Sequence, residues 1–176
     1  MASKKLICLT RGLLSNRLKS LASAWVLSKQ TNRSLYVEWP FEEKVLNLDM
    51  IFTSNFNKFE FSDKFFPSDL SGSAVFYSNI EAIKMYEPRL MNLVNSTKFK
   101  EISAFENFVS KENNIYIFLS DFYPNIKAEE LRKFFDQNNF GFLLEKELLN
   151  FLEIYKLNKN TISVHMRGTD FPCKEI

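Results

Sequence analysis

The stretch LICLTRGLLSNRL, residues 6–18, decides the fold. Its first four residues form an uninterrupted apolar run, which is typical of a strand buried on both faces. Gly12 comes three residues later and allows a tight turn. Ser15 or Asn16 can then cap a helix, because the side-chain oxygen of a cap residue accepts a hydrogen bond from a backbone N–H. We therefore predict a strand, a short loop and a helix in succession.

The residues that follow complete a βαβ unit. Apolar residues recur at helical spacing and predict an amphipathic helix over residues 15–30, with Leu14, Leu18, Leu21, Ala22 and Trp25 on one face. A second strand at residues 34–39 ends before Pro40, which has no backbone N–H to donate. Two strands joined by one helix within about forty residues predict parallel pairing.

The loop between the first strand and the helix is a candidate anion site. Backbone N–H groups and the helix dipole attract negative charge to a helix N-terminus, and Arg11 and Arg17 flank this one. The loop matches neither of the usual glycine-rich phosphate motifs. Two readings stay open at this point: Arg11 and Arg17 belong to an anion site, or they are solvated surface residues.

The rest of the chain predicts further strands and helices. Strands are expected at 74–77 and 115–119, and helices at 79–94 (interrupted by Pro88), after Thr97, at 126–138 and at 144–155. We expect the phenylalanines of residues 41–72 to fill core beneath a long loop, and Phe151 and Tyr155 to lie on a buried helix face. The predicted fold class is α/β: a Rossmann-like, open, mostly parallel sheet with helices on both faces.

Composition excludes several classes of protein. The 176 residues are 45% hydrophobic and 25% charged, as in a globular domain, and the net charge of +2 gives no argument for nucleic acid. No apolar run approaches the roughly 20 residues of a membrane span, and no signal peptide is visible, so we expect a cytoplasmic protein. Cys8 and Cys173 are expected to be free thiols, although a disulfide between them stays open.

A second informative stretch is TISVHMRGTD, residues 161–170. Its β-branched start predicts a strand at 161–164, which leads into His165, Arg167 and Asp170. Ligands of open α/β sheets bind beyond the carboxyl ends of strands, and an arginine there can bind a phosphate through two parallel hydrogen bonds. The alternative is a surface loop with an Arg–Asp ion pair.

Both stretches resemble the fucosyltransferase superfamily. Residues 12–18 (GLLSNRL), with their helix and residues 32–40 (NRSLYVEWP), resemble the superfamily's opening, and residues 164–170 (VHMRGTD) resemble its His-x-Arg-Arg-x-Asp signature. Two positions depart from the pattern. Gly168 replaces the second signature arginine, and Ser15 replaces the glycine before Asn16.

The resemblance implies a GT-B glycosyltransferase that uses a GDP-sugar, with GDP-fucose expected, by an inverting, metal-independent reaction without a further cofactor. Arg167 would contact the donor diphosphate and Asp170 would orient polar groups, both as catalytic residues. His165 would help to hold the nucleotide, and Gly12, Asn16 and Arg17 would line the donor cleft. A glycan or another hydroxyl compound would be the acceptor.

The resemblance also implies a domain division. Residues 1–160 would form the Rossmann-like, acceptor-side N-terminal domain, and residues 161–176 the first strand and signature loop of a C-terminal donor domain that the chain lacks. We therefore expect weak or no activity alone, with a partner chain or self-association through the C-terminal strand. The alternative functions are a non-catalytic α/β module that binds a partner protein, and a degenerate glycosyltransferase fragment.

Overall fold

The computed structural model describes residues 4–40, 47–52, 56–58, 73–93, 99–109, 114–118, 122–138, 146, 149–151 and 153–156. The chain divides into two compact units, Met1–Gly141 and Phe142–Ile176. The predicted strand at 161–164, the triplet His165, Arg167 and Asp170, and Cys173 lie outside the described residues.

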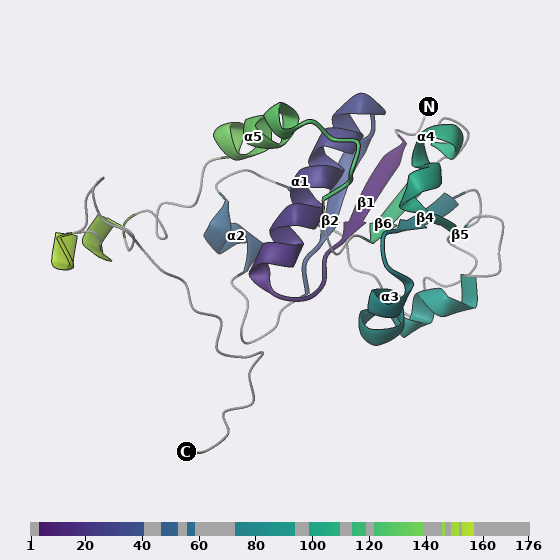
Figure 1. Ribbon diagram of the computed structural model, residues 1–176, viewed down its shortest axis with the longest axis horizontal. Coiled ribbons are helices and arrows are strands. Elements are labelled where there is room, and N and C mark those ends of the chain that lie inside the picture. Colours follow the sequence, from purple (N-terminus) through teal and green to yellow (C-terminus); the bar gives the residue numbers. More distant parts are fainter. Residues whose placement is uncertain are drawn as a thin grey trace, which may run out of the picture. The chain divides into compact units, whose positions relative to one another are not determined.

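A parallel sheet forms the centre of the first unit (Figure 1). Its six strands have the order β3-β2-β1-β6-β4-β5, and every neighbouring pair is parallel. The strands are β1 (Lys5–Leu9), β2 (Ser34–Glu38), β3 (Asn57–Lys58), β4 (Ser73–Tyr77), β5 (Phe99–Glu101) and β6 (Asn114–Phe118). The predicted α/β, Rossmann-like class is confirmed.

Helices cover both faces of this sheet, as predicted (Figure 1). The helical elements are α1 (Leu14–Gln30), α2 (Leu48–Ile51), α3 (Ile80–Tyr86), η3 (Pro88–Leu93), η4 (Ile102–Ala104), α4 (Phe105–Phe108) and α5 (Ala128–Gln137). Alternate residues of β1 enter two separate cores. Leu6 and Cys8 pack with residues of α1 and α4, whereas Ile7 and Leu9 pack with residues of α3 and η3.

Two local predictions need correction. Helix α1 begins one residue early: Leu13 is its cap residue and makes no side-chain cap bond, so neither Ser15 nor Asn16 is the cap. The segment after Thr97 begins as strand β5, and helical structure starts only at Ile102. Both errors have the same cause. The hydrogen-bond partners of a backbone segment depend on which other segments pack beside it in the fold, and the local sequence does not show this.

The aromatic segment at 41–72 is described only in part. Phe52 is 2% exposed and Phe56 packs against the same core cluster, which confirms the core-filling prediction for these two residues. The other phenylalanines of the segment lie outside the described residues.

In the second unit, residues 149–151, 153 and 154 are helical, in line with the predicted helix at 144–155. The prediction that its apolar stripe is core is wrong for Phe151 and Tyr155, which are 50% and 62% exposed. The two rings contact each other, with centroids 4.7 Å apart. A helical stripe identifies a face that can be buried, but a covering element must be supplied by the fold.

Within the described residues, the search for a helix long and apolar enough to cross a bilayer found none. Cys8 is a free thiol at the centre of the sheet and has no solvent exposure. Burial raises the pKa of this thiol to about 12, because the charged thiolate would lose its hydration.

We predict that Cys8 does not react with thiol reagents in the folded protein, because the thiolate is the reacting species. A Cys173→Ser variant leaves Cys8 as the single cysteine and can be titrated with Ellman's reagent. Labelling should be complete in denaturant and negligible at pH 8 without it. Rapid stoichiometric labelling of the native variant would contradict the burial of Cys8.

Candidate functional site

The carboxyl ends of the parallel strands define the candidate site. Strand β1 lies between β2, the next strand in sequence, and β6, which the chain reaches only after β4 and β5. The strand order therefore reverses at β1: the chain continues to β2 and β3 on one side, and β4, β5 and β6 lie on the other. Ligands of open α/β sheets bind at such a switch point. The segment after β1 (Thr10–Leu13) and the end of β2 (Glu38–Pro40) meet there, since the Thr10 N–H donates to Glu38 O at 3.1 Å.

Gly12 shapes the loop after β1. Its φ of +78° lies in the left-handed region that side chains disfavour, and a Cβ on Gly12 would lie 3.3 Å from Asn16 Nδ2. Glycine at this position lets the chain turn sharply from the strand into α1. Gly12 and Asn16, both predicted donor-site residues, therefore lie in contact at the start of the helix.

Arg17 is fully buried and connects this loop to the end of β2. Its Nε donates to Gly12 O at 2.7 Å and its Nη1 to Pro40 O at 2.6 Å. The guanidinium Cζ also lies 5.3 Å from the centre of the Trp39 ring. The solvated-surface reading of Arg17 is wrong, and its observed contacts hold the loop in position. Direct contact of Arg17 with a donor stays a prediction.

Arg11 is partly buried, and only 9% of its side chain is exposed, so the solvated reading fails for it too. Its Nη2 contacts Glu38 Oε1 at 2.6 Å and also Glu87 Oε1, while its Nη1 donates to Thr10 O at 2.6 Å. Glu87 follows α3 and also pairs with Arg89, whose Nη2 lies 2.8 Å from Glu87 Oε2. We call these four residues, Arg11, Glu38, Glu87 and Arg89, the edge ion cluster.

Glu38 is the unusual member of the edge ion cluster. The residue is 8% exposed, and its buried Oε2 has no hydrogen-bond partner among the residues that the structure describes. Burial raises the pKa of this carboxyl above its ordinary value, although the neighbouring Arg11 acts in the opposite direction. The Oε2 atom therefore has spare capacity to accept a hydrogen bond from a polar ligand group.

The start of α1 adds positive potential to the same edge. Its first turn contains no acidic side chain, and Leu13 and Ser15 are exposed there. The positive end of the helix dipole is therefore not neutralised by its own first turn. This arrangement suits a phosphate or another anion.

Sequence reasoning found Gly12, Asn16, Arg11 and Arg17 but missed the other members of the edge ion cluster. One signal for Glu38 was available: it is a carboxylate at the end of an apolar strand, where ligand sites of α/β proteins lie. Glu87 and Arg89 gave no comparable signal, because only the tertiary fold brings them to the loop after β1.

The structure brings Gly12 together with Asn16 and Arg17 at this edge, where the loop after β1 leads into α1. It does not test whether His165, Arg167 and Asp170 join them, because these three residues lie outside the described ones. Across the described part of the chain, no group of three or more histidine, cysteine or acidic residues could hold a metal ion.

Comparison with known proteins gives a likeness of fold. No protein-family model and no curated protein sequence matches the chain. Among solved structures, the fucosyltransferase NodZ from Bradyrhizobium is similar with a TM-score of 0.51 and 17% identity, covering 89% of this chain and 57% of its own. The NodZ alpha-1,6-fucosyltransferase co-crystallized with GDP gives the same values.

The chain therefore has a fucosyltransferase-like fold and spans a little over half the length of the NodZ chains. At 17% identity the likeness shows the fold alone. The binding of GDP is an observation on that NodZ crystal and not on this chain.

We predict that Arg17→Ala lowers the free energy of unfolding by about 2–4 kcal/mol, because the backbone carbonyls of Gly12 and Pro40 lose charge-assisted hydrogen bonds from a buried guanidinium. Arg17→Lys should recover little of this loss, since one ammonium group cannot reproduce the planar fork of donors. Urea unfolding measures the change. Arg132→Ala on the exposed face of α5 serves as the control and should change stability by less than about 0.5 kcal/mol. An equally small effect of Arg17→Ala would contradict the anchoring role.

The raised pKa of Glu38 predicts a pH dependence of stability. A carboxyl with a higher pKa in the folded state binds its proton more tightly there, so its contribution is full below the ordinary value of 4.5 and is lost as pH rises through the folded pKa. Glu38→Gln removes this titration, so the variant should gain stability relative to the native protein as pH rises from 4.5.

Urea unfolding at several values between pH 4 and 7 measures this difference in stability. Glu153→Gln, which also removes one acidic side chain but at an exposed position in the second unit, is the matched control. A difference for Glu38→Gln that moves the opposite way would show that Arg11 outweighs burial at Glu38.

Proposed function

We propose that this chain is the acceptor-side part of a fucosyltransferase-like glycosyltransferase whose donor is a GDP-sugar, with GDP-fucose the first candidate. The reaction is an inverting, metal-independent transfer to a glycan or another hydroxyl acceptor. In this proposal residues 1–160 form the acceptor-side domain, and residues 161–176 belong to the donor side.

One observation supports the proposal most strongly: Gly12 in the loop after β1, and Asn16 and Arg17 in the first turns of α1, lie at the switch point of a parallel sheet. The two motifs that resemble the fucosyltransferase superfamily each follow a strand, one observed and one predicted. The likeness of fold to NodZ adds independent support, since it was found from the backbone at only 17% identity.

The proposed chemistry follows from the residues. The acceptor oxygen attacks the anomeric carbon of the sugar, the bond from that carbon to the diphosphate oxygen breaks, and the acceptor proton leaves to a base. Negative charge grows on the departing GDP, and a fixed cation that contacts it lowers the barrier. Arg167 supplies that cation in the proposal, His165 holds the nucleotide, and Asp170 orients the arginine.

The edge ion cluster gives the other side of the proposed site a defined charge state. Arg11 and Arg89 balance Glu38 and Glu87, so the cluster is close to neutral when both carboxyls are ionised. The start of α1 and the guanidinium of Arg17 then supply positive potential at this edge, and they favour the diphosphate over a cationic ligand.

We predict that Arg167→Ala weakens GDP binding by about ten- to a hundredfold, because a charge-assisted, two-pronged contact to the diphosphate is lost. Arg167→Lys should recover only part of the affinity, since an ammonium group binds phosphate as a point charge. Isothermal titration calorimetry with GDP measures both variants in a protein that contains residues 1–176 and any native sequence that adjoins them.

Arg132→Ala, which removes an exposed arginine from α5, is the matched control and should leave the GDP affinity unchanged. If the protein binds GDP and Arg167→Ala binds it as tightly as the native sequence does, the donor role of Arg167 is wrong. If the protein binds no GDP at millimolar concentration, the GDP-sugar proposal itself is wrong.

A further inference from the structure

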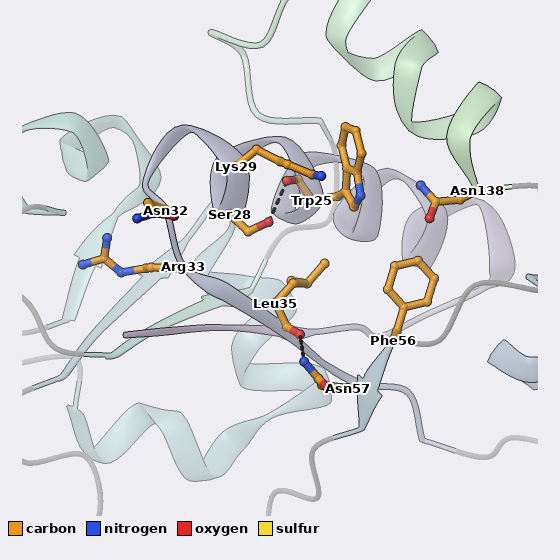
Figure 2. A pocket seen from close by; sticks show the side chains of 9 residues that line it. All are labelled: Trp25, Ser28, Lys29, Asn32, Arg33, Leu35, Phe56, Asn57 and Asn138. Atoms are coloured by element: carbon orange, nitrogen blue, oxygen red, sulfur yellow. Dashed lines mark hydrogen bonds between the residues drawn. The ribbon is translucent and has the colours of Figure 1, made fainter. Parts of the chain in front are cut away.

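A cavity of about 400 Å³ opens at the other end of α1 (Figure 2). Six of its lining residues matter for the argument: Trp25, Lys29, Leu35, Phe56, Asn57 and Asn138. Its size lies within the range of roughly 300–1,000 Å³ that small-molecule pockets occupy. Because α1 is 17 residues long, this cavity lies roughly 25 Å from the Gly12 loop.

The cavity has an apolar floor and a polar wall. Figure 2 shows the side chains of Leu35 and Phe56 on one side of a common space, with Trp25 and Asn138 facing it from the other elements. Lys29 lies beside Trp25, with its Nζ 4.8 Å from the centre of the indole ring. Four separate segments of the first unit therefore contribute to one concave surface.

The orientation of two amides is fixed by their protein partners. Asn138 is 6% exposed, and its Nδ2 donates to Phe134 O at 2.8 Å. Asn57 Nδ2 likewise donates to Leu35 O at 3.1 Å. A carbonyl oxygen can only accept, so each amide must present its nitrogen to that partner and keeps its Oδ1 as an acceptor.

The polar wall thus offers both kinds of hydrogen-bonding group. The amide oxygens of Asn57 and Asn138 accept, whereas the ammonium of Lys29 and the indole N–H of Trp25 donate. A simple anion needs donors alone and would be repelled by amide oxygens. The guanidinium of Arg33, which also lines the cavity, donates to Thr31 O and Val109 O. Helices α1 and α5 also end here, at Gln30 and Gln137, and their negative dipole ends disfavour an anion further.

We propose that this cavity is a second, non-catalytic binding site for a saccharide unit of monosaccharide size. Each hydroxyl of a sugar both donates and accepts, which matches the mixed wall, and the C–H face of a sugar ring packs on an aromatic floor such as Phe56. The inference goes beyond the proposed function and shares no residue with the carboxyl-edge site, so either can fail without the other.

The two tryptophans of the chain provide a direct test. In the ¹⁵N-labelled 176-residue protein, Trp25→Phe and Trp39→Phe variants assign the two indole N–H signals. Methyl glycosides of glucose, galactose, mannose, N-acetylglucosamine and fucose are the probes. We predict that at least one of them shifts the Trp25 signal saturably at millimolar concentration and leaves the Trp39 signal in place.

Lys29→Met keeps the apolar stem of Lys29 and removes one donor, so it should weaken that saturable shift by about five- to tenfold. Lys133→Met, an exposed lysine on α5, is the control and should leave the affinity unchanged. The proposal is overturned if no glycoside shifts the Trp25 signal saturably at 100 mM, if both indole signals move in parallel without saturation, or if sodium sulfate shifts the Trp25 signal where glycosides do not. Unchanged affinity in Lys29→Met also overturns it.

Discussion

The carboxyl edge of the sheet depends on the compensation of buried arginine charge. A guanidinium removed from water is costly unless acceptors surround it. Arg11 meets this requirement with the carboxylates of Glu38 and Glu87, and Arg17 with the backbone carbonyls of Gly12 and Pro40. Together these contacts connect the loop after β1 to the end of β2 and to the segment after α3. The geometry of the candidate site is therefore set by electrostatics as much as by apolar packing.

Regular elements with strong local signals could be predicted from the sequence. The apolar runs at residues 6–9, 34–39, 74–77 and 115–119 all correspond to observed strands, and the helix predicted at 15–30 is α1. Strands β3 and β5 have only two and three residues, and nothing in so short a stretch distinguishes it from a loop. The position of β6 between β1 and β4 was likewise not readable, because it depends on which strands bury each other's faces.

The candidate site likewise contains some residues that the sequence could identify and others that it could not. Gly12 carries its own signal, since a glycine directly after a buried strand indicates a tight turn. The edge ion cluster joins residues from three parts of the chain, so a linear pattern cannot contain it. Exposure of Phe151 and Tyr155 shows a related limit: spacing identifies an apolar helix face but not the element that covers it. The fold shared with NodZ does not identify the site residues of this chain, because activity depends on particular side chains and not on the backbone fold.

The place of β6 in the sheet has a consequence for how the molecule acquires its structure. Lys5 at the start of β1 pairs with Asn114, a separation of 109 residues. The sheet interior cannot close until that much chain has left the ribosome, and pairing over such a separation is slow because a long loop must be ordered first. Until then the edges of β1 and β4 that pair with β6 remain unpaired and exposed to water. The nascent protein is thus most exposed to aggregation before its sixth strand is made.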